Sequence, residues 1–300
     1  MQKLLLIVNP NAGRMKAGSA LMDMVSGFAA ADYEVTVFPT TRKGDAQAKV
    51  ASLTDCGYDL IVCYGGDGTL SEVINGIAQL PAPSPAFSFI TAGTSNDFAR
   101  TVSMPAIISK AVDKIVNGQN VPLDLGEIVE DGVVKHFFYV AAFGLFSSVS
   151  YVVPQSAKKA FGHLAYVAEG AKQAIDIPAY KMKVEYDGKS ITDEFVVGLV
   201  ANTTSVAGMF KVDPAKVILD DGLFELILVK KPSNPILLSK IIMDLSAKKY
   251  HPEYVIFEQV KECKFTCKNE DVAWCLDGEN GGVHRSVEIK NLYRRGLIRL

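Results

Sequence analysis

The sequence lacks the features that mark several large classes of protein. It has no strong charge of either sign, since its formal net charge is -2 and its isoelectric point is near 6.1. Basic pairs such as Lys158-Lys159 and Lys248-Lys249 are too small to form an electrostatic footprint for nucleic acid. We therefore expect no nucleic-acid partner.

No apolar run is long enough to span a membrane. The longest, from Phe137 to Phe146, has about ten residues, whereas a membrane-spanning helix needs roughly twenty. The apolar stretch that follows Met1-Gln2-Lys3 is too short for a signal peptide and fits a first buried strand. We expect a cytoplasmic protein whose contact with the inner face of the membrane is peripheral.

The cysteines and histidines show no metal-binding spacing. None of the five cysteines forms a Cys-x-x-Cys pair, and the four histidines are scattered. Cys263, Cys267 and Cys275 lie in segments that alternate like strands. This pattern favours reduced thiols in a protein core over a metal site.

The 300 residues, 49% of them hydrophobic, can build a sizeable core and suggest two domains. Short apolar runs alternate with helical patterns over the first 120 residues, which is typical of a parallel sheet covered on both faces. The expected strands are 4–8, 34–38, 60–63 and 87–90, and the expected helices are 17–31, 45–53 and 69–78.

After Asn117-Gly118, strand-like runs follow one another directly, which indicates an antiparallel, β-rich part. The expected strands are 121–129, 133–142, 181–186, 191–200, 223–230, 254–267, 272–276 and 283–289, with helices near 157–174 and 235–247. The fold class is therefore α/β. A doubly wound, parallel-sheet nucleotide domain (1–120) precedes a β-rich antiparallel domain (121–290), and a last strand within 291–300 could return to the first.

The most informative motif follows the apolar run 59–64 and reads Gly65-Gly66-Asp67-Gly68-Thr69-Leu70-Ser71-Glu72. Its glycines let the backbone approach a phosphate group, and Thr69 can start a helix whose N–H groups favour negative charge. An acid in such a turn repels phosphate unless a metal ion or the incoming hydroxyl uses it. Asp67 is thus a candidate for chemistry.

Other interpretations of the glycine-rich segments fit less well. A Rossmann fingerprint needs a third glycine where Ser71 stands. A Walker loop at Gly188-Lys189-Ser190 has Lys183 in place of its first glycine, and Asp187-Gly188 is instead typical of a hairpin turn. A plain turn does not require a threonine, an aspartate and three glycines together.

Three more polar segments accompany this turn. They are Asn9-Pro10-Asn11-Ala12-Gly13, Gly93-Thr94-Ser95-Asn96-Asp97-Phe98-Ala99-Arg100 and Leu276-Asp277-Gly278-Glu279. In this order the four motifs resemble the catalytic-domain family of diacylglycerol, sphingosine and ceramide kinases, and most closely its bacterial soluble lipid-kinase branch. Two positions depart from the family pattern. Ala12 stands where the family often has a serine, and Thr91-Ala92 stands before Gly93 where a proline is common.

The resemblance implies an enzyme that transfers the γ-phosphate of ATP, with Mg²⁺, to the hydroxyl of a lipid such as diacylglycerol. It implies a proton acceptor at Glu279 and an essential loop carboxylate at Asp67. The residues implied to line the nucleotide are Asn9, Gly13, Thr40, Gly66, Gly68, Thr69, Glu72 and Thr94. Because a lipid hydroxyl can lose its proton late in a loose transition state, Glu279 need only be well placed.

The resemblance further implies a structural Mg²⁺ held by the Asp221 carboxylate and the backbone carbonyls of Ile218 and Leu223. Water would couple this ion to Asp124 and Asp277, so Asp277 joins the candidate catalytic residues. Taken alone, Asp220-Asp221-Gly222 is also a good turn before a strand. Groups implied to face lipid or phosphate are Arg100, Lys158 and Lys159.

Two alternatives stay open. NAD kinases share the Gly-Gly-Asp-Gly-Thr loop and would phosphorylate a soluble dinucleotide, although Asn202-Thr203-Thr204-Ser205 only faintly matches their Thr-Gly-Ser-Thr-rich segment. A catalytically inactive lipid- or nucleotide-binding module is the other, against which the presence of both Asp67 and Glu279 argues. The sequence specifies neither which lipid alcohol is the substrate nor whether the chain forms a homodimer.

Overall fold

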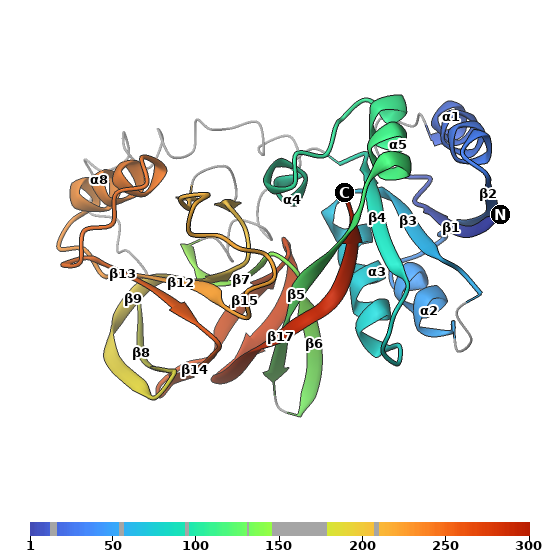
Figure 1. Ribbon diagram of the computed structural model, residues 1–300. Coiled ribbons are helices and arrows are strands. Elements are labelled where there is room, and N and C mark those ends of the chain that lie inside the picture. The colour runs from blue at the N-terminus through green and yellow to red at the C-terminus, as the bar shows by residue number, and fades with distance from the viewer. Residues whose placement is uncertain (13–16, 54–56, 94–95, 131, 146–178, 207–209) are drawn as a thin grey trace.

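The computed structural model describes residues 1–12, 17–53, 57–93, 96–130, 132–145, 179–206 and 210–300 (Figure 1). Within these residues, strands from both halves of the chain join in one 15-stranded sheet. The short hairpin of β10 (Ser205–Val206) and β11 (Phe210–Lys211) lies outside it. None of the described helices is both long and apolar enough to cross a membrane.

The N-terminal part is a parallel sheet with helices on both faces (Figure 1). Its strands, in spatial order, are β2 (Tyr33–Pro39), β1 (Gln2–Val8), β3 (Leu60–Gly65) and β4 (Ala86–Thr91). Its helices are α1 (Ala17–Ala30), α2 (Asp45–Ala51), α3 (Asp67–Gln79), α4 (Asp97–Thr101) and α5 (Ile108–Asn117). Helices α1 and α5 contact each other, as do α2 and α3. The near-continuous burial of β1 and β3 is what two covered faces require.

The C-terminal part is mainly antiparallel. Its strands are β5 (Asn120–Glu130), β6 (Val133–Phe137), β7 (Val140–Gly144), β8 (Tyr180–Tyr186), β9 (Lys189–Ala201), β12 (Phe224–Lys230), β13 (Val255–Val260), β14 (Glu262–Cys267), β15 (Val272–Leu276), β16 (Glu279–His284) and β17 (Ser286–Arg299), and its described helix is α8 (Pro235–Ser246). The predicted fold class is therefore confirmed. The division into domains 1–120 and 121–290 stays a prediction.

Strand β17 connects the two parts. It pairs antiparallel with β14 and β5, and Ile298 pairs in parallel with Phe87 of β4. Two of its arginines also bind helix ends, because Arg295 donates to the carbonyl of Ala78 at the end of α3 and Arg299 donates to that of Ile115 near the end of α5. Such contacts satisfy carbonyls that have no partner within their own helix.

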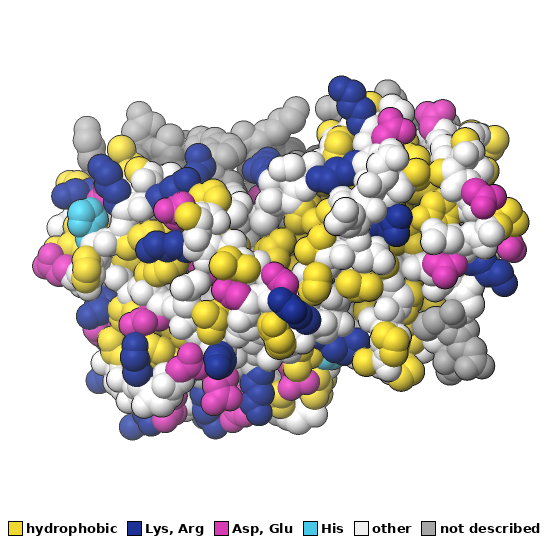
Figure 2. All heavy atoms as spheres, viewed as in Figure 1, with side chains coloured by type: hydrophobic (Ala, Val, Ile, Leu, Met, Phe, Trp, Pro, Cys, Tyr) yellow, Lys and Arg dark blue, Asp and Glu magenta, His cyan; other side chains and the backbone are white. Residues whose placement is uncertain are grey.

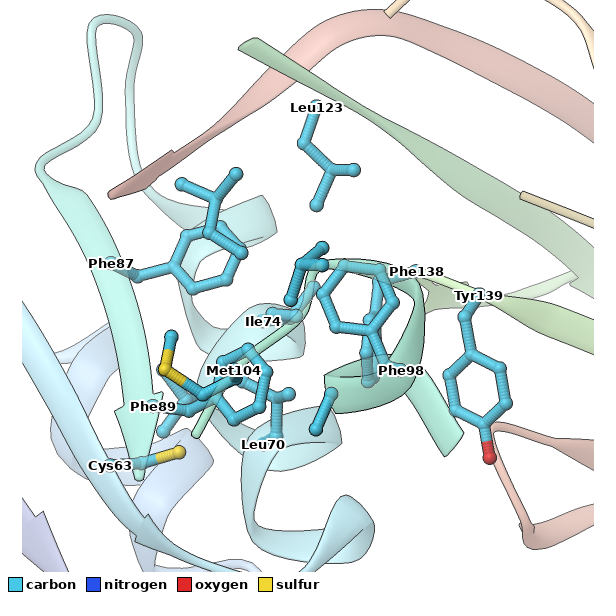
Figure 3. Packing of buried hydrophobic residues seen from close by; sticks show 14 of the residues in the cluster. Cys63, Leu70, Ile74, Phe87, Phe89, Phe98, Met104, Leu123, Phe138 and Tyr139 are labelled. Atoms are coloured by element: carbon cyan, nitrogen blue, oxygen red, sulfur yellow. The ribbon is translucent and has the colours of Figure 1, made fainter. Parts of the chain in front are cut away.

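Apolar side chains fill the space between the parts, where Phe98 of α4 packs edge-on against Phe138 with ring centroids 4.9 Å apart (Figure 3). Phe89 of β4 lies 5.8 Å from Phe98, and Leu123 of β5 belongs to the same cluster. This cluster is continuous from the parallel sheet into the antiparallel part. On the outer face seen in Figure 2, acidic and basic side chains are interspersed over the antiparallel part.

Several predicted boundaries are wrong for tertiary reasons. The run 133–142 is two strands, because the Asp277 carboxylate accepts the N–H groups of residues 138–140. The run 254–267 breaks at Lys261, whose N–H is bound by the carboxylate of Asp187. The predicted strand 283–289 is divided between β16 and β17, and the strand predicted within 291–300 is the second half of one long β17. Helices α4 and α5 were missed, and the helix predicted near 157–174 lies outside the described residues.

Three other predictions from local pattern are confirmed. Asp187 and Gly188 form a hairpin turn between β8 and β9, with φ values of 41° and 78° that suit a type I′ turn. Cys263, Cys267 and Cys275 are buried. Helix α8 lies within one residue of its predicted bounds and is capped by the Asn234 side chain, which accepts the Leu237 N–H.

Glu225 of β12 is a buried acid whose ionisation opposes folding. It is 2% exposed, and its Oε2 accepts no hydrogen bond within the described part of the chain. Its Oε1 accepts a long, 3.5 Å hydrogen bond from Gln259. Burial raises the pKa of this carboxyl from 4.5 to about 8.

We predict that Glu225→Gln makes the protein more stable at pH 8 to 9. Because the folded state binds the proton more tightly, the contribution of Glu225 to stability is present below pH 4.5 and is lost as pH rises through about 8. Urea unfolding across this range should show a gain on the order of 1 to 3 kcal/mol at the alkaline end. Glu258→Gln, on the neighbouring strand and only partly buried, is the control. Equal pH profiles for the wild type and Glu225→Gln would contradict the prediction.

Candidate active site

The four loops that leave the carboxyl ends of the parallel strands lie at one edge of the sheet. The Asn9 side chain after β1 donates from Nδ2 to Thr69 Oγ1 of α3 at 3.2 Å. The Ala92 N–H after β4 donates to the carbonyl of Gly65 at the end of β3. Three of the predicted motifs therefore come together, at the position where open α/β sheets bind ligands.

Glycine allows two of these loops to touch. A Cβ atom on Gly93 would lie 2.9 Å from the Cα of Gly66, so the backbones approach too closely for a side chain. Asn96 follows with a left-handed φ of 48°, and its N–H donates to Asp67 Oδ2 at 3.1 Å. The predicted carboxylate of the turn is thereby oriented by the loop after β4.

Helix α3 begins at Asp67, two residues before the predicted start at Thr69. The carbonyl of Gly66 already accepts the N–H groups of Thr69 and Leu70, so Gly66 is the N-cap. Asp67 consequently lies in the first turn, where the helix dipole favours an acidic side chain. The Thr69 hydroxyl accepts a hydrogen bond from the Asn9 side chain and does not cap the helix.

Thr40 and Glu72 were predicted to line a nucleotide, and in the structure both form hydrogen bonds with backbone groups of neighbouring segments. Thr40 donates its N–H to the carbonyl of Val8 at 2.8 Å. The Glu72 carboxylate accepts the N–H of Gly44 at 2.8 Å and that of Ala46 at 3.2 Å. Glu72 thus fixes the loop between β2 and α2 at the same sheet edge. The predicted residues Gly13 and Thr94 lie outside the described residues, as do Lys158 and Lys159.

Asp277 lies in a two-residue turn between β15 and β16 and is fully buried. Its carboxylate accepts the N–H groups of Phe138, Tyr139 and Val140 at 3.1 Å each. Burial raises the pKa of this carboxyl to about 7, whereas the three N–H donors lower it. Asp277 therefore holds the chain at the junction of β6 and β7.

This turn places Glu279 against the glycine-rich motif at the start of α3. A Cβ on Gly68 would lie only 2.6 Å from Glu279 Oε1, so the carboxylate rests on the first turn of α3. Its other oxygen, Oε2, forms a 2.9 Å ion pair with Lys43 Nζ, and this carboxylate raises the pKa of Lys43. The structure therefore brings Glu279 beside the turn that carries Asp67, although the two motifs are more than 200 residues apart.

Two residues of this region were not predicted. Lys43 lies in a loop with no recognisable motif. Tyr139 stacks on Phe98 through its ring and directs its hydroxyl away from the apolar cluster (Figure 3). Burial raises the pKa of Tyr139, and the charges of Asp67 and then Asp277 raise it further.

Arg100 lies in the last turn of α4, 3.6 Å from Asp97 in an ion pair. It lines a cavity of about 410 Å³ together with two further cations. The described residues that line this cavity are Arg100, Thr204, Ser205, Lys211, Val212, Pro214 and Lys248. Three cations and two hydroxyl groups around one cavity suit an anionic or polar ligand.

The predicted metal residues lie in the turn before β12. Asp221 Oδ1 accepts the Leu223 N–H at 2.9 Å, while Asp124 of β5 is committed to the N–H groups of Gly222 and Arg294. Within the described ranges there is no group of three acidic, histidine or cysteine side chains that could hold a metal. The donors still fit Mg²⁺ in kind, because a carboxylate and backbone carbonyls such as that of Ile218 are hard oxygen ligands. Asp277 makes no described contact with this turn.

We predict that Asp277→Ala is strongly destabilising. It would leave three buried N–H groups without an acceptor, and one such group costs about 1 to 3 kcal/mol. Urea denaturation should show a loss of about 3 kcal/mol or more, and Asp277→Asn, which keeps one oxygen, should lose less. An Asp277→Ala protein as stable as the wild type would show that the carboxylate does not hold the 138–140 backbone.

Comparisons with known proteins place these motifs in a family. Residues 3–128 match the model of the diacylglycerol kinase catalytic domain. Diacylglycerol kinases from Bacillus subtilis and Staphylococcus haemolyticus are 35% and 34% identical, over 98% and 97% of this chain and 95% and 90% of their own lengths. A crystal structure of a diacylglycerol kinase from Bacillus anthracis is 26% identical, with a TM-score of 0.76 over 99% of this chain and 96% of that one.

The open alternative also has a structural counterpart. Yeast NADH kinase in complex with NADH aligns with a TM-score of 0.53 over 100% of this chain and 82% of that one. At 11% identity this likeness indicates a shared fold alone. The bacterial relatives, in contrast, match in sequence from end to end, and the chain belongs to the diacylglycerol kinase family.

Proposed function

We propose that this protein transfers the γ-phosphate of ATP, with Mg²⁺, to the hydroxyl of a lipid alcohol such as diacylglycerol. Family membership supports the lipid kinase class. The observation that carries the proposal is the contact of the Glu279 carboxylate with Gly68. It sets a proton acceptor from one half of the chain against a phosphate-binding turn from the other.

The nucleotide phosphates would bind at the carboxyl edge of the parallel sheet. Gly66 and the first turn of α3 offer backbone N–H groups at the positive end of a helix dipole, which suits an anion. The absence of a side chain at Gly66 and Gly68 lets a phosphate reach these groups. Asn9 and Thr69 add polar side chains at the same edge.

Glu279 would accept the proton of the substrate hydroxyl. In a loose phosphoryl-transfer transition state the attacking hydroxyl keeps its proton until late, so position matters more than basicity. Glu279 is half exposed, at 45% of its side chain, and can therefore accept the proton of a substrate hydroxyl that enters from solvent or a lipid surface. Asp67, held by Asn96, would face the same phosphate.

A Mg²⁺ ion would be held by Asp221 with the carbonyls of Ile218 and Leu223. When bound, it would supply positive charge that offsets acids such as Asp124 in this part of the fold. We assign the cation-lined cavity at Arg100 to the face of the protein that contacts the membrane. There Lys211 and Lys248 would lie against an anionic membrane surface. This assignment makes membrane contact peripheral.

The defining experiment is incubation with ³²P-labelled ATP, Mg²⁺ and a panel of lipid alcohols, with NAD in a parallel reaction, followed by phase extraction. We expect label in the organic phase, as a phosphorylated lipid identified by mass spectrometry. Label that stays in the aqueous phase as phosphorylated dinucleotide would overturn the lipid assignment in favour of a NAD kinase-like reaction.

We predict that Glu279→Ala and Asp67→Ala abolish turnover with little loss of stability. General acid–base catalysis contributes about 10²- to 10⁴-fold, so lipid phosphorylation should fall at least a hundredfold. Neither acid is buried, so the urea midpoint should change little. Glu288→Ala is a matched control, because Glu288 forms an exposed ion pair with Lys264 far from the site. Wild-type turnover in both variants would mean that the site is wrong.

Gly68→Ala tests the position of Glu279 without removing its charge. The new methyl group would displace the tip of the flexible Glu279 side chain, while alanine suits a helix better than glycine. We predict that turnover falls by about tenfold or more whereas thermal stability is kept or slightly raised. Unchanged turnover would show that the contact with Gly68 is not needed for the reaction.

A further inference from the structure

The side chain of Lys43 crosses from the nucleotide half of the chain to Glu279. Its Nζ lies 2.9 Å from Glu279 Oε2, while Glu279 Oε1 rests on Gly68. Because both oxygens belong to one carboxylate, the ammonium lies one carboxyl group away from the first turn of α3. That turn is where the nucleotide phosphates are proposed to bind.

The loop that carries Lys43 is held in place on both sides. Asp45 accepts the N–H groups of Thr41 and Arg42 at 2.7 and 3.0 Å, and its side chain also binds that of Arg42. Glu72 accepts the Gly44 N–H. Arg42 is therefore occupied by Asp45, and a fixed backbone directs the neighbouring Lys43 toward the site.

The ion pair contributes little to stability. The side chains of Lys43 and Glu279 are 77% and 45% exposed, and exposed pairs are weak because water screens the charges. Glu279, however, is the proposed proton acceptor, and a carboxylate that is bound to an ammonium has one oxygen fewer for a hydroxyl. An anionic phosphate with several oxygens is a stronger acceptor for the same ammonium.

We propose that Lys43 binds the terminal phosphate of the donor nucleotide and rests on Glu279 when the site is empty. This inference rests on the proposed function. Arrival of the γ-phosphate draws the ammonium from Glu279, so one oxygen of the carboxylate becomes available to the lipid hydroxyl. The long, flexible side chain of lysine allows this move with the loop backbone fixed.

Nucleotide affinity of Lys43→Gln tests this role directly. We expect Lys43→Gln to bind a non-hydrolysable ATP analogue roughly ten- to a hundredfold more weakly than the wild type, which is the loss of one charge-assisted hydrogen bond. Binding of ADP, which lacks the γ-phosphate, should change little. Lys43→Arg should retain most of the analogue affinity. Lys264→Gln, which breaks the exposed pair with Glu288, is the matched control and should bind both nucleotides as the wild type does.

The exchange of partners is tested by combining Lys43→Gln with Glu279→Gln. Glu279→Gln alone should bind the analogue about two- to fivefold more tightly, since the weak ion pair need no longer be broken. In the Lys43→Gln background the same change should give a smaller gain. Equal gains in both backgrounds would overturn the exchange.

Other outcomes separate this inference from the function on which it rests. If the wild type phosphorylates lipid and Lys43→Gln keeps its preference for the ATP analogue over ADP, then Lys43 does not bind the terminal phosphate. An equal loss of ADP and analogue affinity would likewise overturn the inference, because it would indicate a general distortion of the loop. If the wild type phosphorylates no lipid, the proposed function fails and the inference fails with it.

Discussion

The buried carboxylate of Asp277 fixes the turn that carries Glu279. By accepting three consecutive N–H groups at residues 138–140, it ends β6, starts β7 and holds the β15–β16 turn against them. Glu279 follows two residues later, and its carboxylate lies over Gly68. Burial disfavours the charge that these donors require, so the geometry of the site depends on a balance between desolvation and hydrogen bonding.

The N-terminal sheet could be predicted from the sequence because its information is local. Parallel strands that are buried on both faces appear as short apolar runs, and the glycine-rich turn after β3 marks the carboxyl edge of the sheet, where such sheets generally bind ligands. The same holds for Asp187-Gly188, whose left-handed conformations specify a tight hairpin. Four motifs in a fixed order then identified the family, which carries more information than any one of them.

The breaks in the antiparallel part could not be predicted, because distant residues cause them. The interruption after Phe137 depends on a carboxylate 139 residues away from Phe138, and the one at Lys261 depends on a carboxylate 74 residues away. Lys43 has no local signal either, since its partner lies 236 residues further along the chain. Glu72 belongs to the glycine-rich motif, but the sequence does not indicate that its carboxylate accepts an N–H group of the β2–α2 loop, because only the packing of α2 on α3 brings the two together.

The topology of β17 has a consequence for how the protein is made. This strand occupies residues 286–299, yet it pairs with β4 and β5 and covers the carbonyl ends of α3 and α5. The N-terminal sheet therefore keeps an open edge at β4 until residues 286–299 have been synthesised and have paired with it. Completion of the N-terminal sheet thus waits for a strand from the other part of the chain, so a product truncated before β17 would keep an unpaired strand edge.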